Sequence, residues 1–190
     1  MRITLTEPEA FSTLLTQLTS QEPTSPITGI ATDSRECITG DLYIALKGEK
    51  ADGHQFIEQA EKNGAVASLV EYTESVSNEM DYFIVDDVLE TMGSLAHAWR
   101  KQFNIPVIGI TGSNGKTSTK ELLKHIFEDK ENVLATTGNF NTSIGLPLTL
   151  LQLTVKHTIS IIEMGANQPG DIAYLCAIAE PTHGLITNIA

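Results

Sequence analysis

The feature that most constrains this chain is a glycine-containing loop that follows an apolar strand and precedes a helix. A strand is predicted over residues 107–110, the loop reads Thr-Gly-Ser-Asn-Gly-Lys-Thr over residues 111–117, and a helix is predicted over residues 117–127. Strand, glycine loop and helix in this order are the context in which backbone amides and a helix N-terminus bind phosphate. The sequence therefore predicts an α/β fold with a phosphate-binding loop.

Each residue type in this loop suits one part of a bound nucleotide. Lys116 can reach the β- and γ-phosphate oxygens and is the predicted catalytic residue, while the Thr117 hydroxyl can coordinate Mg²⁺. ATP contacts are predicted for consecutive residues of the loop and the helix start: Gly112, Ser113, Asn114, Gly115, Lys116, Thr117 and Ser118. Because Ile110 stands where the strict Walker A pattern has its first glycine, a tight glycine turn with a solvated lysine is the alternative.

Apolar strands alternate with helices in the part of the chain after residue 105. Further strands are predicted at 133–135, 158–163 and 184–188, which favours a mainly parallel sheet covered on both faces. Residues 1–83 are predicted to form a smaller α/β domain, and residues 84–190 the first part of a P-loop central domain. Because a covering helix normally follows such a strand, we expect the chain to be truncated, to lack a C-terminal domain and to be inactive alone.

Net charge argues against several classes of partner. The 12 Lys and Arg residues face 24 Asp and Glu residues, for a formal net charge of -12, which disfavours non-specific binding to nucleic acid or to anionic membranes. The uncharged stretch 132–155 is interrupted by glycine, asparagine and proline, and is not expected to span a bilayer. No signal peptide is visible, since Glu7 and Glu9 interrupt the N-terminal segment. We expect a cytoplasmic protein with no nucleic-acid partner and no membrane insertion.

Polar residues follow two more of the predicted strands. Glu163 ends the strand at 158–163, at the edge where open parallel sheets bind ligands, so its carboxylate can complete a Mg²⁺ site with Thr117. An ordinary strand-end glutamate facing water is the alternative. Asn139 and Asn141 follow the strand at 133–135, where they can either hydrogen-bond a ligand or form a turn.

Together these motifs resemble the Mur ligases, a family of ATP-dependent amide ligases of peptidoglycan synthesis that is related to folylpolyglutamate synthase. The loop has the shorter T-G-x-x-G-K-T form, and residues 32–35, 40–48 and 52–54 look like the nucleotide-sugar domain shared by two members of the family. Residues 137–141, 144–149 and 163–170 are similar to the member that joins D-alanyl-D-alanine to UDP-N-acetylmuramoyl-tripeptide, and not to the diaminopimelate-adding member. One departure is Asp171, where Glu is more usual.

The resemblance implies a reaction and a set of substrate contacts. ATP would phosphorylate the tripeptide carboxylate, with Mg²⁺ at Thr117 and Glu163, and the amine of D-alanyl-D-alanine would attack the acyl phosphate. Contacts with the UDP-muramoyl substrate are implied for residues of both parts of the chain: Asp33, Ser34, Arg35, Lys47, Asp52, Gly53, His54, Asn139, Asn141 and Thr142. Spacing alone would also allow Asp33 and Arg35 to be a surface ion pair in a turn.

Two alternatives stay open. The first is another ligase of the superfamily, either the diaminopimelate-adding enzyme or a ligase similar to folylpolyglutamate synthase, and a panel of substrates would separate these. The second is a nucleotide-binding module or switch without ligase activity, because a P-loop does not itself determine the acceptor of the phosphoryl group. The resemblance of the first domain to a UDP-sugar domain argues against a switch.

Overall fold

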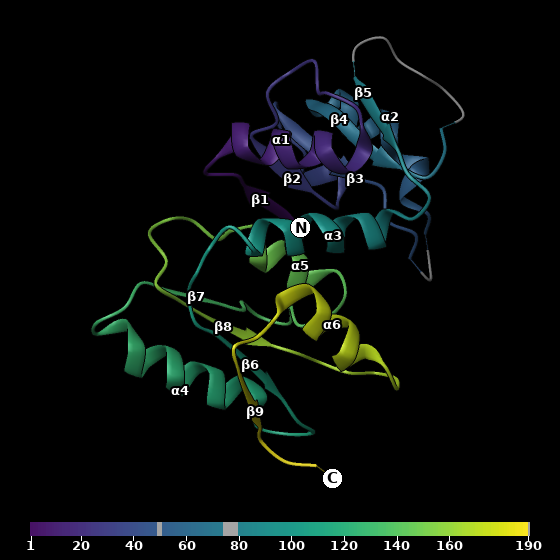
Figure 1. Cartoon of the computed structure of the whole chain (residues 1–190). Coiled ribbons are helices and arrows are strands. Elements are labelled where there is room, and N and C mark those ends of the chain that lie inside the picture. The colour runs from purple at the N-terminus through teal and green to yellow at the C-terminus, as the bar shows by residue number, and fades with distance from the viewer. Residues whose placement is uncertain (49–50, 74–79, 190) are drawn as a thin grey trace. The chain divides into compact units, whose positions relative to one another are not determined.

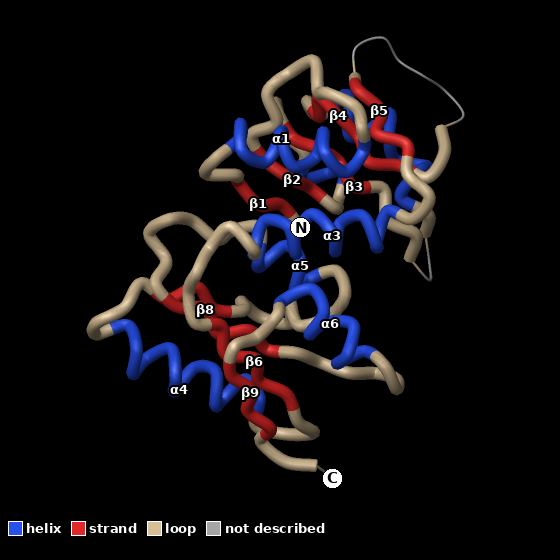
Figure 2. Tube along the Cα trace, viewed as in Figure 1, coloured by secondary structure: helices blue, strands red, loops and turns tan. Residues whose placement is uncertain are grey.

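The computed structural model describes residues 1–48, 51–73 and 80–189, which form two compact units, Met1–Met92 and Gly93–Ala190. Each unit contains a sheet and helices, so the predicted α/β class is confirmed (Figure 2). The predicted domain boundary lies between residues 83 and 84, whereas the structure divides inside helix α3 (Val88–Arg100). The division therefore falls within a continuous helix and not in a linker.

The first unit has a sheet whose strands lie in chain order. Within the described residues, the neighbouring strands are β1 (Arg2–Thr4), β2 (Gly29–Ala31), β3 (Asp41–Ile44), β4 (Ala65–Val70) and β5 (Asp81–Ile84). Strand β1 pairs antiparallel with β2, and the other pairs are parallel. The helical elements are α1 (Pro8–Thr19), the 3-10 turns η1 (Ser34–Glu36) and η2 (Gly53–Phe56), and α2 (Ile57–Lys62). The carboxyl ends of β2, β3 and β4 thus share one edge of the sheet, where the predicted substrate residues follow them.

Strand β1 was not predicted, and a buried ion pair explains its place in the sheet. Arg2 Nε lies 2.7 Å from Asp41 Oδ2, and Arg2 Nη2 lies 2.9 Å from Asp41 Oδ1. The Asp41 side chain is fully buried, so it needs this charged partner. A Cβ atom at Gly29 would lie only 2.3 Å from Asp41 Oδ1, so a residue without a side chain lets β2 pass beside the pair.

The second unit confirms the predicted parallel sheet. Within the described residues, the strand order is β7-β8-β6-β9, and every pair is parallel. The strands are β6 (Val107–Thr111), β7 (Val133–Ala135), β8 (Ile159–Glu163) and β9 (His183–Ile186), and the helices between them are α4 (Lys116–Glu128), α5 (Gly145–Leu150) and α6 (Asp171–Ala179). No helix in the described ranges is both long enough and apolar enough to cross a membrane.

The order of these strands places the helices on both faces of the sheet. The chain passes from β6 outward to β7 through α4, and then returns in the opposite direction through α5 and α6 to β8 and β9. Because parallel crossovers are right-handed, reversing the direction moves the helices to the other face. Figure 1 shows α4 and α6 on opposite sides of this sheet. All four strands end at the same edge, which is where the loops carrying the predicted site residues meet.

Candidate functional site

The phosphate loop connects β6 to α4 through two glycines with positive φ. Gly112 has φ of 136° and Gly115 has φ of 80°, a region that residues with a side chain rarely adopt. Helix α4 begins at Lys116, and no side chain caps its N-terminus. The first amides of a helix have no intrahelical partner, so these N–H groups and the positive end of the helix dipole are directed toward a potential anion. This is the geometry required of a phosphate-binding loop.

Residues after β9 brace the loop from the side. The backbone amide of Ser113 donates to Asn188 O at 3.0 Å, and that of Asn114 donates to Asn188 Oδ1 at 2.8 Å. The Thr187 hydroxyl donates to Asn114 O at 2.6 Å. Neither Thr187 nor Asn188 was predicted as a site residue. The strand predicted at 184–188 included both residues, whereas β9 ends at Ile186, so the prediction hid their position at the strand end.

Lys116 lies against the loop and not free in solvent. Its Nζ atom donates to Gly112 O at 2.5 Å, and the side chain is half-buried. The lysine is therefore only partly solvated, and its contact with a phosphate stays a prediction. The ammonium group is held beside the helix N-terminus, where both attract negative charge.

Glu163, at the end of β8, contacts residues that follow β6 and β7. Its Oε2 atom accepts a hydrogen bond from the Thr117 hydroxyl at 3.0 Å, and its Oε1 atom accepts one from Asn141 Nδ2 at 2.8 Å. The residue is only 2% exposed, so the alternative of a glutamate facing water is wrong. Its backbone amide donates to the Thr136 hydroxyl at 2.9 Å. The predicted pairing of Glu163 with Thr117 is thus present as a direct contact.

The oxygen atoms of Thr117 and Glu163 fit a magnesium site. Mg²⁺ prefers oxygen ligands, keeps several waters, and commonly takes one or two carboxylates plus phosphate oxygens of a substrate. In residues 1–48, 51–73 and 80–189 there is no group of three or more His, Cys, Asp or Glu side chains that could hold a metal ion. One carboxylate and one hydroxyl lie together beside the phosphate loop, and Mg²⁺ can use such a pair with waters and phosphate oxygens.

The loop between β7 and α5 carries the other predicted residues of this unit. Asn141 is held through both its side chain and its backbone. Its side chain contacts Glu163, and its backbone carbonyl accepts a hydrogen bond from the Gly165 amide at 2.8 Å. Asn139 is exposed. The Thr142 carbonyl accepts a hydrogen bond from the Leu146 amide, in the first turn of α5, at 2.9 Å. Of these three residues, Asn141 is therefore the one in direct contact with Glu163, and the substrate contacts of Asn139 and Thr142 stay predictions.

In the first unit, residues 33–35 form a turn after β2. The Arg35 guanidinium donates to both carboxylate oxygens of Asp33, at 2.9 and 2.6 Å, and these hydrogen bonds lower the pKa of Asp33. The buried Ser34 hydroxyl donates to Gln59 Oε1 at 2.7 Å. Ser34 thus ties the turn to α2, while the Arg35 side chain is 76% exposed. The surface ion pair in a turn, which spacing alone allowed, is therefore present, and the substrate contacts of Asp33, Ser34 and Arg35 stay predictions.

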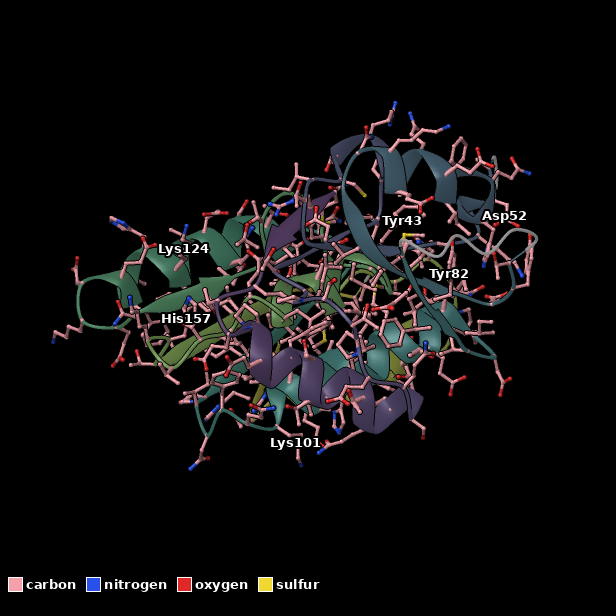
Figure 3. The ribbon with its side chains drawn as sticks, turned by 90° about the horizontal axis from the view of Figure 1, so that it is seen from above. Tyr43, Asp52, Tyr82, Lys101, Lys124 and His157 are labelled. Atoms are coloured by element: carbon pink, nitrogen blue, oxygen red, sulfur yellow. The ribbon has the colours of Figure 1, made fainter. Side chains whose placement is uncertain are left out.

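A second cluster follows β3 and β4 at the same sheet edge. Asp52 Oδ1 lies 2.6 Å from His54 Nδ1, and Asp52 Oδ2 accepts the Tyr72 hydroxyl at 2.7 Å. His54 Nε2 accepts the Glu71 amide at 2.9 Å, so the imidazole proton lies on Nδ1, facing Asp52. The His54 ring also stacks on Tyr72, with centroids 4.3 Å apart. Figure 3 labels Asp52 at this edge of the unit.

Lys47 and Gly53 complete this cluster. Lys47 forms an ion pair with Glu71, and its Nζ atom lies 5.3 Å from the centroid of the Tyr72 ring. A Cβ atom at Gly53 would lie 2.7 Å from the backbone of Leu46, so a side chain cannot be placed there without moving the backbone. Glu71 and Tyr72 were not predicted as site residues. No local pattern marks them, because they reach the others only through the pairing of β3 with β4.

The titration of Asp52 gives a testable property of this cluster. Burial alone would raise the pKa of Asp52, but hydrogen bonds from the His54 amide, the Tyr72 hydroxyl and the His54 ring outweigh it and lower the pKa to about 2. An unfolded aspartate titrates near ~3.9. The folded pKa is the lower one, so the stabilisation by Asp52 is complete above pH about 4 and is lost as the pH falls toward about 2.

We therefore expect Asp52→Asn to flatten the acid dependence of stability. Urea unfolding at pH 7 and at steps down to pH about 3 should show the wild-type free energy of unfolding falling more steeply than that of the variant. Glu58→Gln is the control, because Glu58 is an exposed residue of the same unit in a 3.6 Å surface pair with Lys62. Equal slopes for wild type and Asp52→Asn would contradict the assigned hydrogen bonds.

Comparison with known proteins gives consistent matches over most of the chain. The profile described as "Mur ligase family, catalytic domain" matches residues 26–123, and that described as "Mur ligase middle domain" matches residues 110–190. A protein of Synechocystis named UDP-N-acetylmuramoyl-tripeptide--D-alanyl-D-alanine ligase is 45% identical over 164 residues, which is 86% of this chain. The chain spans 36% of the length of that relative.

Solved structures agree with the sequence matches. The crystal structure of MurF from Acinetobacter baumannii superposes with a TM-score of 0.88 at 37% identity, covering 94% of this chain and 41% of that one. MurF ligase from Thermotoga maritima, solved in complex with ADP, superposes with a TM-score of 0.77 at 40% identity, covering 84% of this chain and 37% of that one. The fold of this chain is therefore similar to the corresponding part of the MurF structures.

Proposed function

Because this chain belongs to the Mur ligase family, we propose that it serves the ATP-dependent ligation of D-alanyl-D-alanine to UDP-N-acetylmuramoyl-tripeptide in peptidoglycan synthesis. The observation that carries the proposal is the contact of Thr117 with Glu163, 3.0 Å apart beside the phosphate loop. A loop that only binds a phosphate needs no buried carboxylate next to it. A carboxylate with a neighbouring hydroxyl is what a metal-assisted phosphoryl transfer requires.

Residues of the second unit have different proposed roles toward the nucleotide. When bound, ATP supplies the phosphoryl group that activates the tripeptide carboxylate, and Mg²⁺ supplies positive charge beside the phosphates. The amides at the start of α4, together with Gly112, Ser113, Asn114, Gly115 and Ser118, form the bed for the phosphate oxygens. Lys116 would stabilise charge on the transferred group, and Thr117 with Glu163 would hold the metal. Asn141 orients the Glu163 carboxylate through its side-chain amide.

We assign the UDP-muramoyl substrate to the first unit, proposed as a domain of residues 1–83. The support is that two polar motifs follow neighbouring parallel strands, β2 and β3, at one sheet edge, where ligands of open α/β sheets bind. The Arg35 guanidinium, paired with Asp33, and the Lys47 ammonium, paired with Glu71, are the groups proposed to contact a diphosphate. Asp52, Gly53 and His54 shape the loop between them. In the second unit, Asn139, Asn141 and Thr142 are likewise proposed as contacts of this substrate.

The acceptor is proposed to be D-alanyl-D-alanine, and not the acceptor of another superfamily member. The sequence match to relatives named for this acceptor is long enough to include both units, since it extends over 164 residues. Two residues of the motifs that carry the resemblance, Asn141 and Glu163, also take part in the hydrogen bonds beside Thr117. A nucleotide switch would not require the polar motifs of the first unit.

A ligation assay with the full-length protein tests this function. ATP, Mg²⁺ and UDP-N-acetylmuramoyl-tripeptide are supplied with D-alanyl-D-alanine, and parallel reactions carry UDP-N-acetylmuramoyl-dipeptide with diaminopimelate, or folate with glutamate. Mass spectrometry of the products and measurement of ADP release should show an adduct with D-alanyl-D-alanine alone. An adduct in either parallel reaction would point to the other ligases, and ATP binding without any adduct would point to a nucleotide-binding module.

A further inference from the structure

One buried charged residue of the second unit has no part in the scheme above. Lys120 lies one helical turn after Lys116 on α4 and is only 1% exposed. Its Nζ atom donates to Thr136 O at 2.7 Å and lies 2.9 Å from Glu121 Oε1. Burying an ammonium group costs solvation free energy, and an apolar side chain of similar length would fill the same space without that cost. A role for the amino group itself would explain why a lysine is found here.

The acceptor of this lysine leads directly to Glu163. Thr136 follows β7, and its own amide donates to Ile161 O of the neighbouring strand at 3.0 Å. The Thr136 hydroxyl accepts the backbone amide of Glu163 at 2.9 Å. Lys120 thus binds the carbonyl of Thr136, and the hydroxyl of Thr136 binds the backbone amide of Glu163. Thr136 is therefore the one residue that connects Lys120 to Glu163.

The same helix contacts Glu163 at a second point. Thr117, three residues before Lys120, donates to Glu163 Oε2 at 3.0 Å. Helix α4 therefore fixes both the side chain of Glu163, through Thr117, and its backbone, through Lys120 and Thr136. A metal ligand must be oriented accurately to bind the ion. The residues that orient it are therefore nearly as important to metal binding as the ligand itself.

We propose that Lys120 is a positioning residue that fixes the Glu163 carboxylate for Mg²⁺ binding beside the nucleotide. The inference rests on the proposed function, because it takes Thr117 and Glu163 to be the metal-binding pair. Lys120 does not touch nucleotide or metal in this assignment. It acts by keeping the end of β7, and with it the backbone of Glu163, at a fixed distance from α4. Methionine at this position would preserve the packing but could not donate to the Thr136 carbonyl.

The test compares nucleotide binding with and without the metal. A non-hydrolysable ATP analogue is titrated calorimetrically into the full-length wild type, into Lys120→Met and into Lys124→Met, first with a chelator and then with Mg²⁺. Lys124→Met is the matched control, because Lys124 is on the same helix but is half-exposed and pairs with Glu128 (Figure 3). We expect Lys120→Met to lose about 10- to 100-fold of the affinity gained with Mg²⁺, the effect typical of residues that orient a metal ligand. Binding in the chelator should stay at the wild-type level.

Two further variants separate positioning from a loss of folding. Thr136→Val removes the acceptor for the Glu163 amide but leaves the carbonyl that Lys120 contacts, and it should reproduce the loss of metal-dependent affinity. In a Glu163→Gln background, Lys120→Met should cause no additional loss, because residues acting through one group are not additive. A general structural defect would lower affinity equally in both backgrounds and in the chelator.

The outcomes for the inference and for the proposed function are distinct. Metal-dependent affinity that survives in both Lys120→Met and Thr136→Val would overturn the positioning role and leave the metal site intact. Wild-type protein that binds the analogue equally with and without Mg²⁺ would instead overturn the metal site, and the inference with it. An equal loss in Lys124→Met would show that helix charge, and not the contact with Thr136, is responsible.

Discussion

Replacing Lys116 by alanine is expected to reduce ATP-dependent ligation by about 10³-fold or more, a loss on the scale of other cations that stabilise a phosphoryl-transfer transition state. The ammonium group lies beside the N-terminus of α4 and against the Gly112 carbonyl, where a γ-phosphate would be within its reach. Binding of UDP-N-acetylmuramoyl-tripeptide should change little, because the residues assigned to the uridine end belong to the first unit. Initial rates at saturating substrate, with calorimetry of the UDP-linked substrate, measure the two effects separately.

The control for this variant is Lys124→Ala, which removes the same charge from the exposed side of α4. Its ligation rate should equal that of the wild type. Activity of Lys116→Ala within about tenfold of wild type would mean that Lys116 contributes little to the transition state. A large loss of UDP-substrate binding in Lys116→Ala would instead indicate that the variant has disturbed the fold.

Gly112→Ala is expected to weaken nucleotide binding strongly by altering the backbone of the phosphate loop. Its φ of 136° is unfavourable for alanine by about 1–2 kcal/mol. The added Cβ would also lie 2.1 Å from Thr187 Oγ1 and 2.9 Å from Asn188 O, and relieving such overlap costs typically about 1–3 kcal/mol. The two costs add to about 2–5 kcal/mol against the loop conformation, which corresponds to about 30-fold to several thousand-fold in affinity if binding requires that conformation, at about 1.4 kcal/mol for each factor of ten.

Gly170→Ala separates the two causes. Gly170 also has a positive φ, 98°, but no atom lies within 4 Å of a Cβ placed there. Its substitution should lower stability through backbone strain alone and leave nucleotide affinity unchanged. Calorimetry with the ATP analogue and urea unfolding of both variants give the comparison. If Gly112→Ala retained nucleotide affinity, then the contacts of Thr187 and Asn188 with the loop would not be needed for its shape.

The sequence predicted well those parts of the fold that are encoded in adjacent residues. The strand before the phosphate loop, the helix after it and the parallel sheet follow from apolar runs separated by glycines, and the structure has all of them. Glu163 could be placed beside Thr117 because the carboxyl ends of parallel strands meet at one edge, so knowing two strand ends was enough. The strand order, which makes β6 and β8 direct neighbours, was not needed for that prediction.

The missed residues depend on contacts that no local pattern encodes. Strand β1 has three residues and is fixed by Arg2 reaching the buried Asp41, a partner far along the chain. Lys120 belongs to a helix with charged residues on its outer side, and spacing alone would assign it to solvent. Tyr72 joins Asp52 and His54 only because β3 and β4 pair. In each case the sequence shows the residue type, and the tertiary structure determines its environment.

The strand order of the second unit also determines when the phosphate site can form during synthesis. Strand β6 emerges from the ribosome first but lies between β8 and β9, so both of its hydrogen-bonding partners are made later. Such non-local parallel pairing is slow because a long segment must be closed before any contact is gained. The Thr187 and Asn188 contacts with the loop need residues that follow β9. The nascent chain should therefore acquire nucleotide affinity only after β9 has been synthesised.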